Sequence, residues 1–170
     1  LLIGALDAAA AIRRRARVAP GPALFAPLRR AVASDLRMLV CGGARLERRT
    51  AARLEALGWD VRSGYGLSET ASLIVGNLHA KRLGTEGRAL PGSEVRIDRP
   101  DAEGVGEALL RGPGVFAGYL GAPEATARAF DADGFFRSGD LGRLDADGFL
   151  EIRGRASEAL TLGGGETLDP

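Results

Sequence analysis

The sequence predicts an α/β fold in two parts: a partial parallel-sheet subdomain, then a small antiparallel β-rich subdomain of the distorted-barrel kind. In the first part, strand-like runs at 36–40 and 59–63 flank a helical pattern, and each run ends in a glycine-containing loop, as in a parallel βαβ unit. From Gly84 onward, short alternating runs lie between glycine and proline turns, which is typical of antiparallel strands. A composition of 45% hydrophobic and 26% charged residues is that of a globular chain with its own core.

The overall charge and the rare side chains exclude several classes of protein. A formal net charge of +1 is too small to indicate a nucleic-acid binder. One cysteine and one histidine exclude an internal disulfide and a Cys/His zinc site, and they favour a reducing, cytoplasmic setting. The apolar run 1–12 is too short to span a bilayer and lacks the basic leader of a signal peptide. Since the chain starts without methionine and stops after a glycine-rich turn, we expect an excised piece of a longer protein.

The first 36 residues carry six arginines against two aspartates. Residues 1–17 have the spacing of a helix with one apolar face, and its arginines cluster at the end. Such a run is usually a solvated helix end, whereas the alternative is a basic amphipathic helix in peripheral contact with an anionic membrane. Three prolines in 19–27 predict a break in the secondary structure.

The first glycine loop, Cys41-Gly42-Gly43-Ala44, follows a predicted short buried strand at 36–40. The helix after it has Leu46, Thr50, Leu54 and Leu57 spaced for one face, and Gly58 is a plausible stop. The second strand leads into Gly64-Tyr65-Gly66. Because the carboxyl ends of parallel strands meet at one edge of a sheet, we expect the two loops to lie side by side and to share a ligand.

The stretch 64–70, Gly-Tyr-Gly-Leu-Ser-Glu-Thr, is the main candidate site. Its glycines let the backbone approach a ligand, and the Tyr65 ring offers a surface for stacking. The hydroxyl and carboxylate oxygens of 68–70 suit phosphate and a hard cation such as Mg²⁺. The plain alternative is a surface turn. A dinucleotide fingerprint would need glycine at Glu69, and a hydrolase elbow would need glycine at Thr70 with His79 as base, so each fails by one residue.

The second part of the chain adds one more candidate stretch. Runs 94–97 and 107–111 predict strands and 122–130 a short helix, while the tetrapeptide Asp-Ala-Asp-Gly at 131–134 and 145–148 predicts tight turns that do not match a calcium loop. Asp140 follows Gly139, so its carboxylate is open to two ligand hydroxyls, such as those of a ribose. Arg155 would suit the phosphate of the same ligand. The alternatives are a turn-stabilising acid and a surface charge.

In this order and spacing, the motifs resemble the adenylate-forming superfamily of acyl-CoA synthetases, luciferases and peptide-synthetase adenylation domains. The matching runs cover almost all of residues 36–170: 41–44, 64–70, 84–92, 106–120, 124–130 and 134–155. The long spacing of 154–170 is most like the long-chain fatty acyl-CoA synthetase branch. The resemblance implies that the chain is part of the large N-terminal domain of that fold, with 1–83 as the α/β part, 84–154 as the β-rich part and 155–170 as a hinge into a further domain.

The resemblance also implies a reaction and its cofactors. A carboxylic acid, most readily a fatty acid, would attack the α-phosphate of Mg-ATP to give acyl-AMP and pyrophosphate, and coenzyme A would then take the acyl group. Adenylation of an aryl or amino acid, or a catalytically inactive nucleotide-binding relative, are the alternatives. The setting would be cytoplasmic, with membrane association if the substrate is a lipid.

The resemblance also implies a role for each matching residue. Gly42, Gly43 and Ala44 would line the adenine, and Tyr65, between Gly64 and Gly66, would stack on it. Ser68 would bind phosphate, Glu69 would hold Mg²⁺, Asp140 would bind the ribose with Arg155 beside it, and Ser157 would be the hinge. Ser68 and Ser138 replace the family's usual threonines but keep a hydroxyl, whereas Ser157 replaces a common lysine or aspartate, and Thr161 a residue that is often basic or branched. The family's phosphate loop and its adenylation lysine would lie outside residues 1–170. We therefore expect the chain alone to bind nucleotide weakly and not to turn over.

Overall fold

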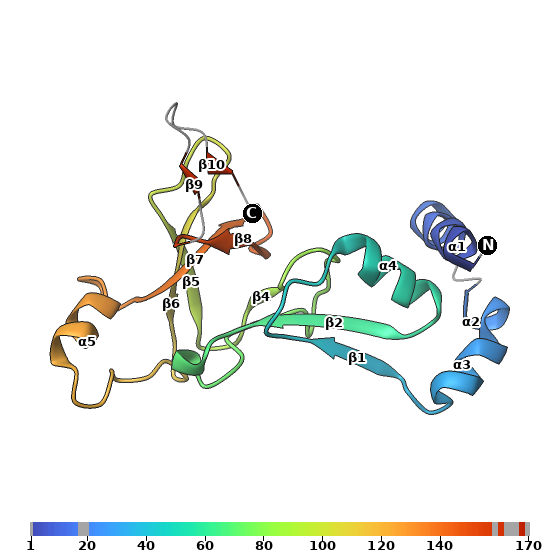
Figure 1. The fold of residues 1–170 in the computed structure, drawn as a ribbon, viewed down its shortest axis with the longest axis horizontal. Coiled ribbons are helices and arrows are strands. Elements are labelled where there is room, and N and C mark those ends of the chain that lie inside the picture. Colours follow the sequence, from blue (N-terminus) through green and yellow to red (C-terminus); the bar gives the residue numbers. More distant parts are fainter. Residues whose placement is uncertain (1, 17–20, 158–159, 162–166, 169–170) are drawn as a thin grey trace.

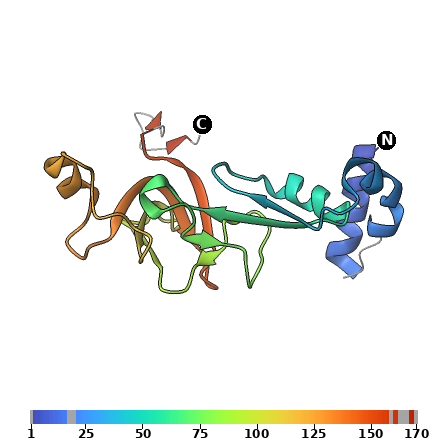
Figure 2. The same cartoon turned by 90° about the horizontal axis from the view of Figure 1, so that it is seen from below.

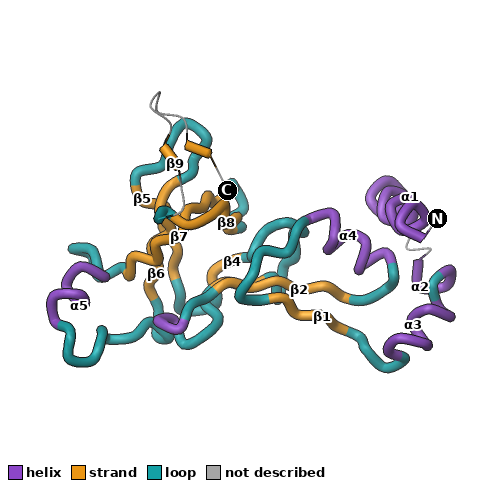
Figure 3. The backbone as a smooth tube through the Cα atoms, viewed as in Figure 1, coloured by secondary structure: helices purple, strands orange, loops and turns teal. Residues whose placement is uncertain are grey.

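The computed structural model describes residues 2–16, 21–157, 160–161 and 167–168 of the chain, and Figure 1 shows their elongated arrangement. Strands fill the middle and most of the helices gather at the two ends (Figure 3). The elements in order are α1 (Leu2–Ala16), α2 (Gly21–Leu24), α3 (Ala26–Ala33), β1 (Met38–Cys41), α4 (Arg48–Ala56), β2 (Asp60–Tyr65), the 3-10 turn η1 (Ser68–Thr70), β3 (Val75–Gly76), β4 (Arg88–Ala89), β5 (Glu94–Asp98), β6 (Gly106–Arg111), α5 (Pro123–Ala129), β7 (Phe136–Leu144), β8 (Leu150–Arg155), β9 (Leu160–Thr161) and β10 (Thr167–Leu168).

The first sheet has the order β1-β2-β3-β4. β1 and β2 are parallel, with Met38 opposite Asp60 and Cys41 opposite Ser63, and α4 is the crossover between them. β3 and β4 add antiparallel strands, so the predicted α/β fold with a partial parallel sheet is confirmed. A second sheet, β5-β6-β7-β8, is entirely antiparallel, as the alternating runs predicted.

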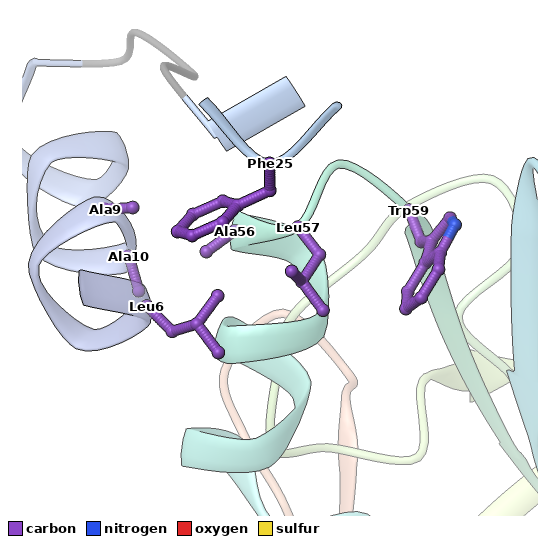
Figure 4. Close-up of a cluster of buried hydrophobic side chains, with 7 residues drawn as sticks. All are labelled: Leu6, Ala9, Ala10, Phe25, Ala56, Leu57 and Trp59. Atoms are coloured by element: carbon purple, nitrogen blue, oxygen red, sulfur yellow. The ribbon is translucent and has the colours of Figure 1, made fainter. Parts of the chain in front are cut away.

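The N-terminal core packs α1 against α4. Figure 4 shows Leu6, Ala9 and Ala10 of α1 facing Phe25 and the end of α4, and these side chains are buried. Asp7 of α1 accepts hydrogen bonds from Arg53 Nε at 2.7 Å and from Arg49 at 2.8 Å. These two arginines hold the pKa of the Asp7 carboxyl far below its ordinary value. The helix predicted for 1–17 is therefore docked by both apolar contact and charge.

Three expectations for this half need correction. Residues 19–20 of the predicted break lie outside the described part. Of the others, 21–24 form α2, and 26–27 begin α3. Pro27 is tolerated there because it falls in the first turn of the helix, where its missing N–H costs nothing. The strand predicted as buried, β1, exposes 51% of Met38 and 69% of Val40 and pairs only with β2 within the described residues. The buried face of α4 is formed by Ala51, Glu55 and Ala56, whereas Thr50 is exposed.

A second apolar core joins the two sheets, and the β-rich half has a recurring turn. The buried members of this core are Ile74 and Val75 at β3 of the first sheet, and Leu110, Phe136 and Leu150 of the second sheet. At 101–105, 131–135 and 145–149 the first aspartate accepts backbone N–H groups through its carboxylate, and glycine at the fourth position has φ of 79°, 77° and 78°. The sequence predicted turns at the last two sites, and the first is a third copy that ends in valine in place of phenylalanine.

The segment between the sheets, residues 77–93 with β4 in it, forms hydrogen bonds to both sheets. Glu86 donates its N–H to Leu150 O of β8 at 2.8 Å, Leu150 donates to Gly87 O at 2.8 Å, and Leu90 donates to Ile74 O at 3.0 Å. Figure 2, seen from below, shows β2 running from the helical end towards the β-rich end. The carboxyl end of β2 is thereby held against β7 and β8. Among the described helices, none combines the length and the apolar character that crossing a membrane requires.

Candidate functional site

The two glycine loops of the first sheet meet, as the parallel arrangement predicted. The parallel register brings Cys41 opposite Ser63, and a Cβ added to Gly42 would lie 3.8 Å from Gly64 O. Gly43 has φ of +74°, which favours glycine. At Gly66 a Cβ would overlap the Ser72 carbonyl, so only glycine allows this close backbone approach.

A hollow of about 170 Å³ opens where these loops face the second sheet. It is lined by five segments of the chain, which are the two glycine loops, the segment between the sheets, strand β7 and strand β8. The lining residues are Gly43, Ala44, Arg45, Gly64, Tyr65, Gly66, Leu67, Glu86, Asp140, Ile152 and Arg155. Seven of the eight predicted cofactor-binding residues therefore line one hollow, and the eighth, Gly42, lies next to Gly64.

Tyr65 and Asp140 are the centre of this hollow. The Tyr65 hydroxyl donates a hydrogen bond to Asp140 Oδ2 at 2.6 Å, and Arg155 Nε lies 2.9 Å from Asp140 Oδ1. The Asp140–Arg155 pair follows directly from the register of β7 and β8. Asp140 is buried, and its N–H donates to Ser138 Oγ at 3.0 Å. Tyr65 and Asp140, which we expected to face one ligand, therefore lie in contact with each other.

The Tyr65 hydroxyl stays protonated and therefore acts as a hydrogen-bond donor. Burial, and then the hydrogen bond to the Asp140 carboxylate, raise the pKa of Tyr65 well above its ordinary value. The carboxylate of Asp140 has about four lone-pair positions, of which Tyr65 and Arg155 occupy two. The remaining positions are available to hydroxyls of a ligand.

The stretch 68–70 lies beside the hollow and does not line it. Ser68 is exposed at the start of η1, and the half-buried Glu69 accepts a hydrogen bond from the Tyr119 hydroxyl at 3.1 Å. Thr70 is buried and its hydroxyl is used internally, accepting the Leu67 N–H at 2.8 Å and donating to Leu67 O. The sequence reading of Thr70 as a second phosphate-binding hydroxyl is therefore wrong, because that hydroxyl caps its own turn.

No group of three or more candidate metal ligands occurs among the described residues. Besides Asp140 and Glu86 in the lining, Glu69 offers a carboxylate next to the hollow, and its only side-chain hydrogen-bond donor in the described chain is Tyr119. A single carboxylate suits Mg²⁺ where phosphates supply the other oxygens, because Mg²⁺ keeps few protein ligands. The residues present thus fit Mg²⁺ that arrives with a polyphosphate.

Two charged lining residues were missed by the sequence reading. Arg45 follows the first glycine loop, and Glu86 sits in the run 84–88, which the sequence marked only as a glycine-rich turn. Burial raises the pKa of Glu86 to about 7. The only sequence signal was an acid inside that glycine-rich turn, and nothing local shows that it is buried.

A larger cavity of about 710 Å³ lies between α1, α4 and the β7–β8 hairpin. Its charged lining is largely paired within itself, as in Arg13–Glu55 at 3.4 Å, Arg45–Glu151 at 3.6 Å and Arg143–Glu151 at 2.9 Å. None of the motif residues at 64–70 borders it. Ser157, the predicted hinge, is exposed just after β8, where the neighbouring Ala156 N–H donates to Gly139 O at 2.9 Å, and residues 158–159 beyond it lie outside the described part.

Comparison with known proteins was made for sequence and for structure. A family model described as AMP-binding enzyme matches residues 7–120. Long-chain-fatty-acid–CoA ligase ACSBG1 of Bos taurus is 44% identical over 117 residues, covering 67% of this chain and 16% of that protein. Long-chain-fatty-acid–CoA ligase FadD15 of Mycobacterium tuberculosis is 38% identical over 148 residues, covering 86% of this chain and 24% of that protein. The chain thus spans less than a quarter of either relative.

Two solved structures resemble the fold. O-succinylbenzoate coenzyme A synthetase (MenE) of Bacillus subtilis, in complex with ATP and magnesium ion, has a TM-score of 0.72 at 28% identity over 87% of this chain and 33% of its own. ATP-bound MatB of Rhodopseudomonas palustris has a TM-score of 0.73 at 30% identity over 88% of this chain and 32% of its own.

Proposed function

This chain belongs to the AMP-binding enzyme family, and we propose that it is a segment of an ATP-dependent acyl-CoA synthetase that binds the adenosine of ATP in the hollow at Tyr65 and Asp140. The observation that carries the proposal is the 2.6 Å hydrogen bond between these two side chains, which brings an aromatic ring and a buried acid to one hollow. An aromatic face and a carboxylate suit the base and the ribose hydroxyls of one nucleoside.

In the proposed reaction, a carboxylate oxygen of the acid attacks the α-phosphorus of ATP, and pyrophosphate leaves with the electron pair of the broken P–O bond. The thiol sulfur of coenzyme A then attacks the acyl carbon and loses its proton, and AMP leaves. Asp140 would accept the ribose hydroxyls, with Arg155 beside it, and Ser68 would donate to phosphate oxygens. Mg²⁺ held by Glu69 would neutralise phosphate charge.

A long-chain fatty acid is the acid we propose. The support is the identity of 44% and 38% to two relatives named as long-chain-fatty-acid–CoA ligases. A specific observation favours aryl acids as the second candidate, since the similar structures include an anthranilate CoA ligase and O-succinylbenzoate CoA synthetase.

With either acid, residues 1–83 would contribute the adenine and phosphate contacts and 84–154 the ribose contact. Residues 155–170, with Ser157, would form a hinge.

The test is acid-dependent ATP–pyrophosphate exchange in the longer enzyme to which this chain would belong, with long-chain fatty acids and aryl acids compared. We expect Tyr65→Ala, Glu69→Gln and Asp140→Asn each to lower exchange at least about tenfold, the loss expected when a charged or positioning contact is removed. Glu124→Ala is the matched control, because the side chain of Glu124 is 90% exposed on α5. Unchanged exchange in all three site variants would show that ATP does not bind in this hollow, whereas absence of exchange in the unchanged enzyme would identify a catalytically inactive binding relative.

A further inference from the structure

Glu86 is a buried acid that lines the proposed nucleotide site. It lines the same hollow as Tyr65 and Asp140, and only 6% of the residue is exposed. Its backbone is fixed by the N–H bond to Leu150 O at 2.8 Å. No hydrogen bond or ion pair within the described part of the chain involves its carboxyl group, and its oxygens are not among the fully enclosed atoms that lack a partner.

The surroundings of Glu86 decide its protonation. Burial raises its pKa to about 7, while the charge of Arg45 lowers it and that of Glu151 raises it. The other charged or titratable groups around the hollow are Asp140 on β7, Arg155 on β8 and Tyr65 on β2. Because Asp140 is bound by both Tyr65 and Arg155, its charge is already paired, and its remaining lone pairs are those proposed for the ribose hydroxyls. The carboxyl of Glu86 is left to interact with whatever enters the hollow.

A neutral carboxyl group presents a donor and an acceptor side by side, whereas the ionised form presents acceptors only. The outer edge of adenine carries an acceptor, N1, next to a donor, the 6-amino group. A neutral Glu86 is therefore complementary to adenine. An ionised Glu86 would oppose the N1 lone pair and would instead match the N1–H of hypoxanthine or guanine.

We propose that Glu86 reads the base in this hollow, its O–H donating to N1 of adenine and its carbonyl oxygen accepting from the 6-amino group. The inference rests on the proposed function, since it requires a nucleoside in the hollow. It adds a residue that recognises the edge of the base. It also makes the discrimination between adenine and hypoxanthine dependent on pH, because the neutral carboxyl can match either base whereas the ionised form still accepts the N1–H of hypoxanthine and opposes N1 of adenine.

The experiment is a titration of the full chain with adenosine and with inosine, followed by NMR, which measures millimolar dissociation constants. These nucleosides lack the phosphate that would itself titrate between pH 6 and 8. If only the neutral form of a group with a pKa of about 7 binds, the Kd for adenosine rises about tenfold from pH 6 to pH 8. Inosine binding should not weaken over this range, so the ratio of the adenosine Kd to the inosine Kd should rise.

Variants separate Glu86 from other titrating groups. Glu86→Gln keeps one donor and one acceptor, so its adenosine Kd should stay near the pH 6 value of the unchanged chain at both pH values. His79 is still present in that variant, so a flat profile excludes the histidine as the cause. Arg45→Gln should move the midpoint of the profile to higher pH and Glu151→Gln to lower pH, because each removes a charge that acts on Glu86. If Glu86→Gln does not fold, the opposite shifts of the midpoint in Arg45→Gln and Glu151→Gln still test whether Glu86 is the titrating group.

The outcomes distinguish this inference from the proposed function. If adenosine binds with the same Kd at pH 6 and pH 8 and Glu86→Gln behaves like the unchanged chain, the role of Glu86 is overturned while the nucleotide site stands. If neither nucleoside nor ATP binds at millimolar concentration, both are overturned. A tenfold pH effect that vanishes in Glu86→Gln and moves in opposite directions in the other two variants supports the inference.

Discussion

Tyr65 ties two segments together that are 75 residues apart in sequence, through its bond to Asp140. Replacing Tyr65 by phenylalanine keeps the ring and removes only this bond, leaving one oxygen of a buried carboxylate without its donor. We expect the free energy of unfolding to fall by about 2 kcal/mol, since hydrogen bonds to charged groups contribute about 1.5–3 kcal/mol. Denaturant titration measures the change.

The matched control is Tyr119→Phe, which removes a hydroxyl bonded to Glu69 at a residue that is 40% exposed. Water replaces that partner, so its cost should be well below that of Tyr65→Phe. Equal costs for the two variants would contradict the structural role given to the Tyr65–Asp140 bond.

Glu86 should make the folded chain less stable as the pH rises. Its pKa is raised from 4.5 to about 7 on folding, so its contribution is fully present below pH 4.5 and is lost as the pH rises through 7. The difference between these two pKa values corresponds to a loss of unfolding free energy on the order of 3 kcal/mol, measured relative to Glu86→Gln. Thermal or denaturant unfolding of both proteins at pH 5 and pH 8 checks this, and parallel pH curves would rule it out.

At the scale of single elements, the three Asp–x–x–Gly turns offer an internal comparison. Asp145 accepts the N–H groups of Asp147 and Phe149 at 2.9 Å each and pairs with Arg82, whereas Asp101 accepts two N–H groups without an arginine bridging it in the described chain. Arg82 also lies over the Phe149 ring at 4.5 Å. The turn at 145–149 is thus held by more contacts than the turn at 101–105.

We expect Asp145→Ala to destabilise the chain by about 2 kcal/mol and Asp101→Ala by about 1 kcal/mol, since both lose N–H acceptors and only the first leaves an arginine behind. Urea unfolding midpoints measure both. A larger loss at Asp101 than at Asp145 would show that the arginine and the ring add nothing to the turn.

Elements with a strong local period were predictable, and contacts made by the fold were not. Parallel pairing of β1 and β2 and the meeting of their loops follow from strand, glycine loop and helix in succession. Pro27 in the first turn of α3 and the bond between Thr70 and Leu67 are local, but a proline also marks breaks and a hydroxyl also binds ligands, so the residue type alone does not decide between these roles. The exposure of Val40 depends on neighbours that the local pattern does not specify. Glu86 was missed for the same reason, because its burial comes from the packing of the inter-sheet segment against β8.

At the scale of the whole molecule, a site for the base and ribose is not a complete catalyst. The chain spans 24% of its FadD15 relative, and the described residues hold no metal cluster of their own. We expect the chain alone to bind ATP weakly and to show no ATP–pyrophosphate exchange above a protein-free blank. Calorimetry and the exchange assay on the same preparation measure the two properties, and robust exchange by the chain would refute the expectation.

The open side of β1, with 51% of Met38 and 69% of Val40 exposed, has a practical consequence. An uncovered edge strand with apolar side chains is a template for pairing with other chains, and natural proteins often guard such edges with lysine. Concentrated samples of the chain should therefore self-associate into β-rich oligomers, and Val40→Lys should delay this without altering the melting temperature. Light scattering against concentration would detect the difference, and a chain that stays monomeric at high concentration would speak against it.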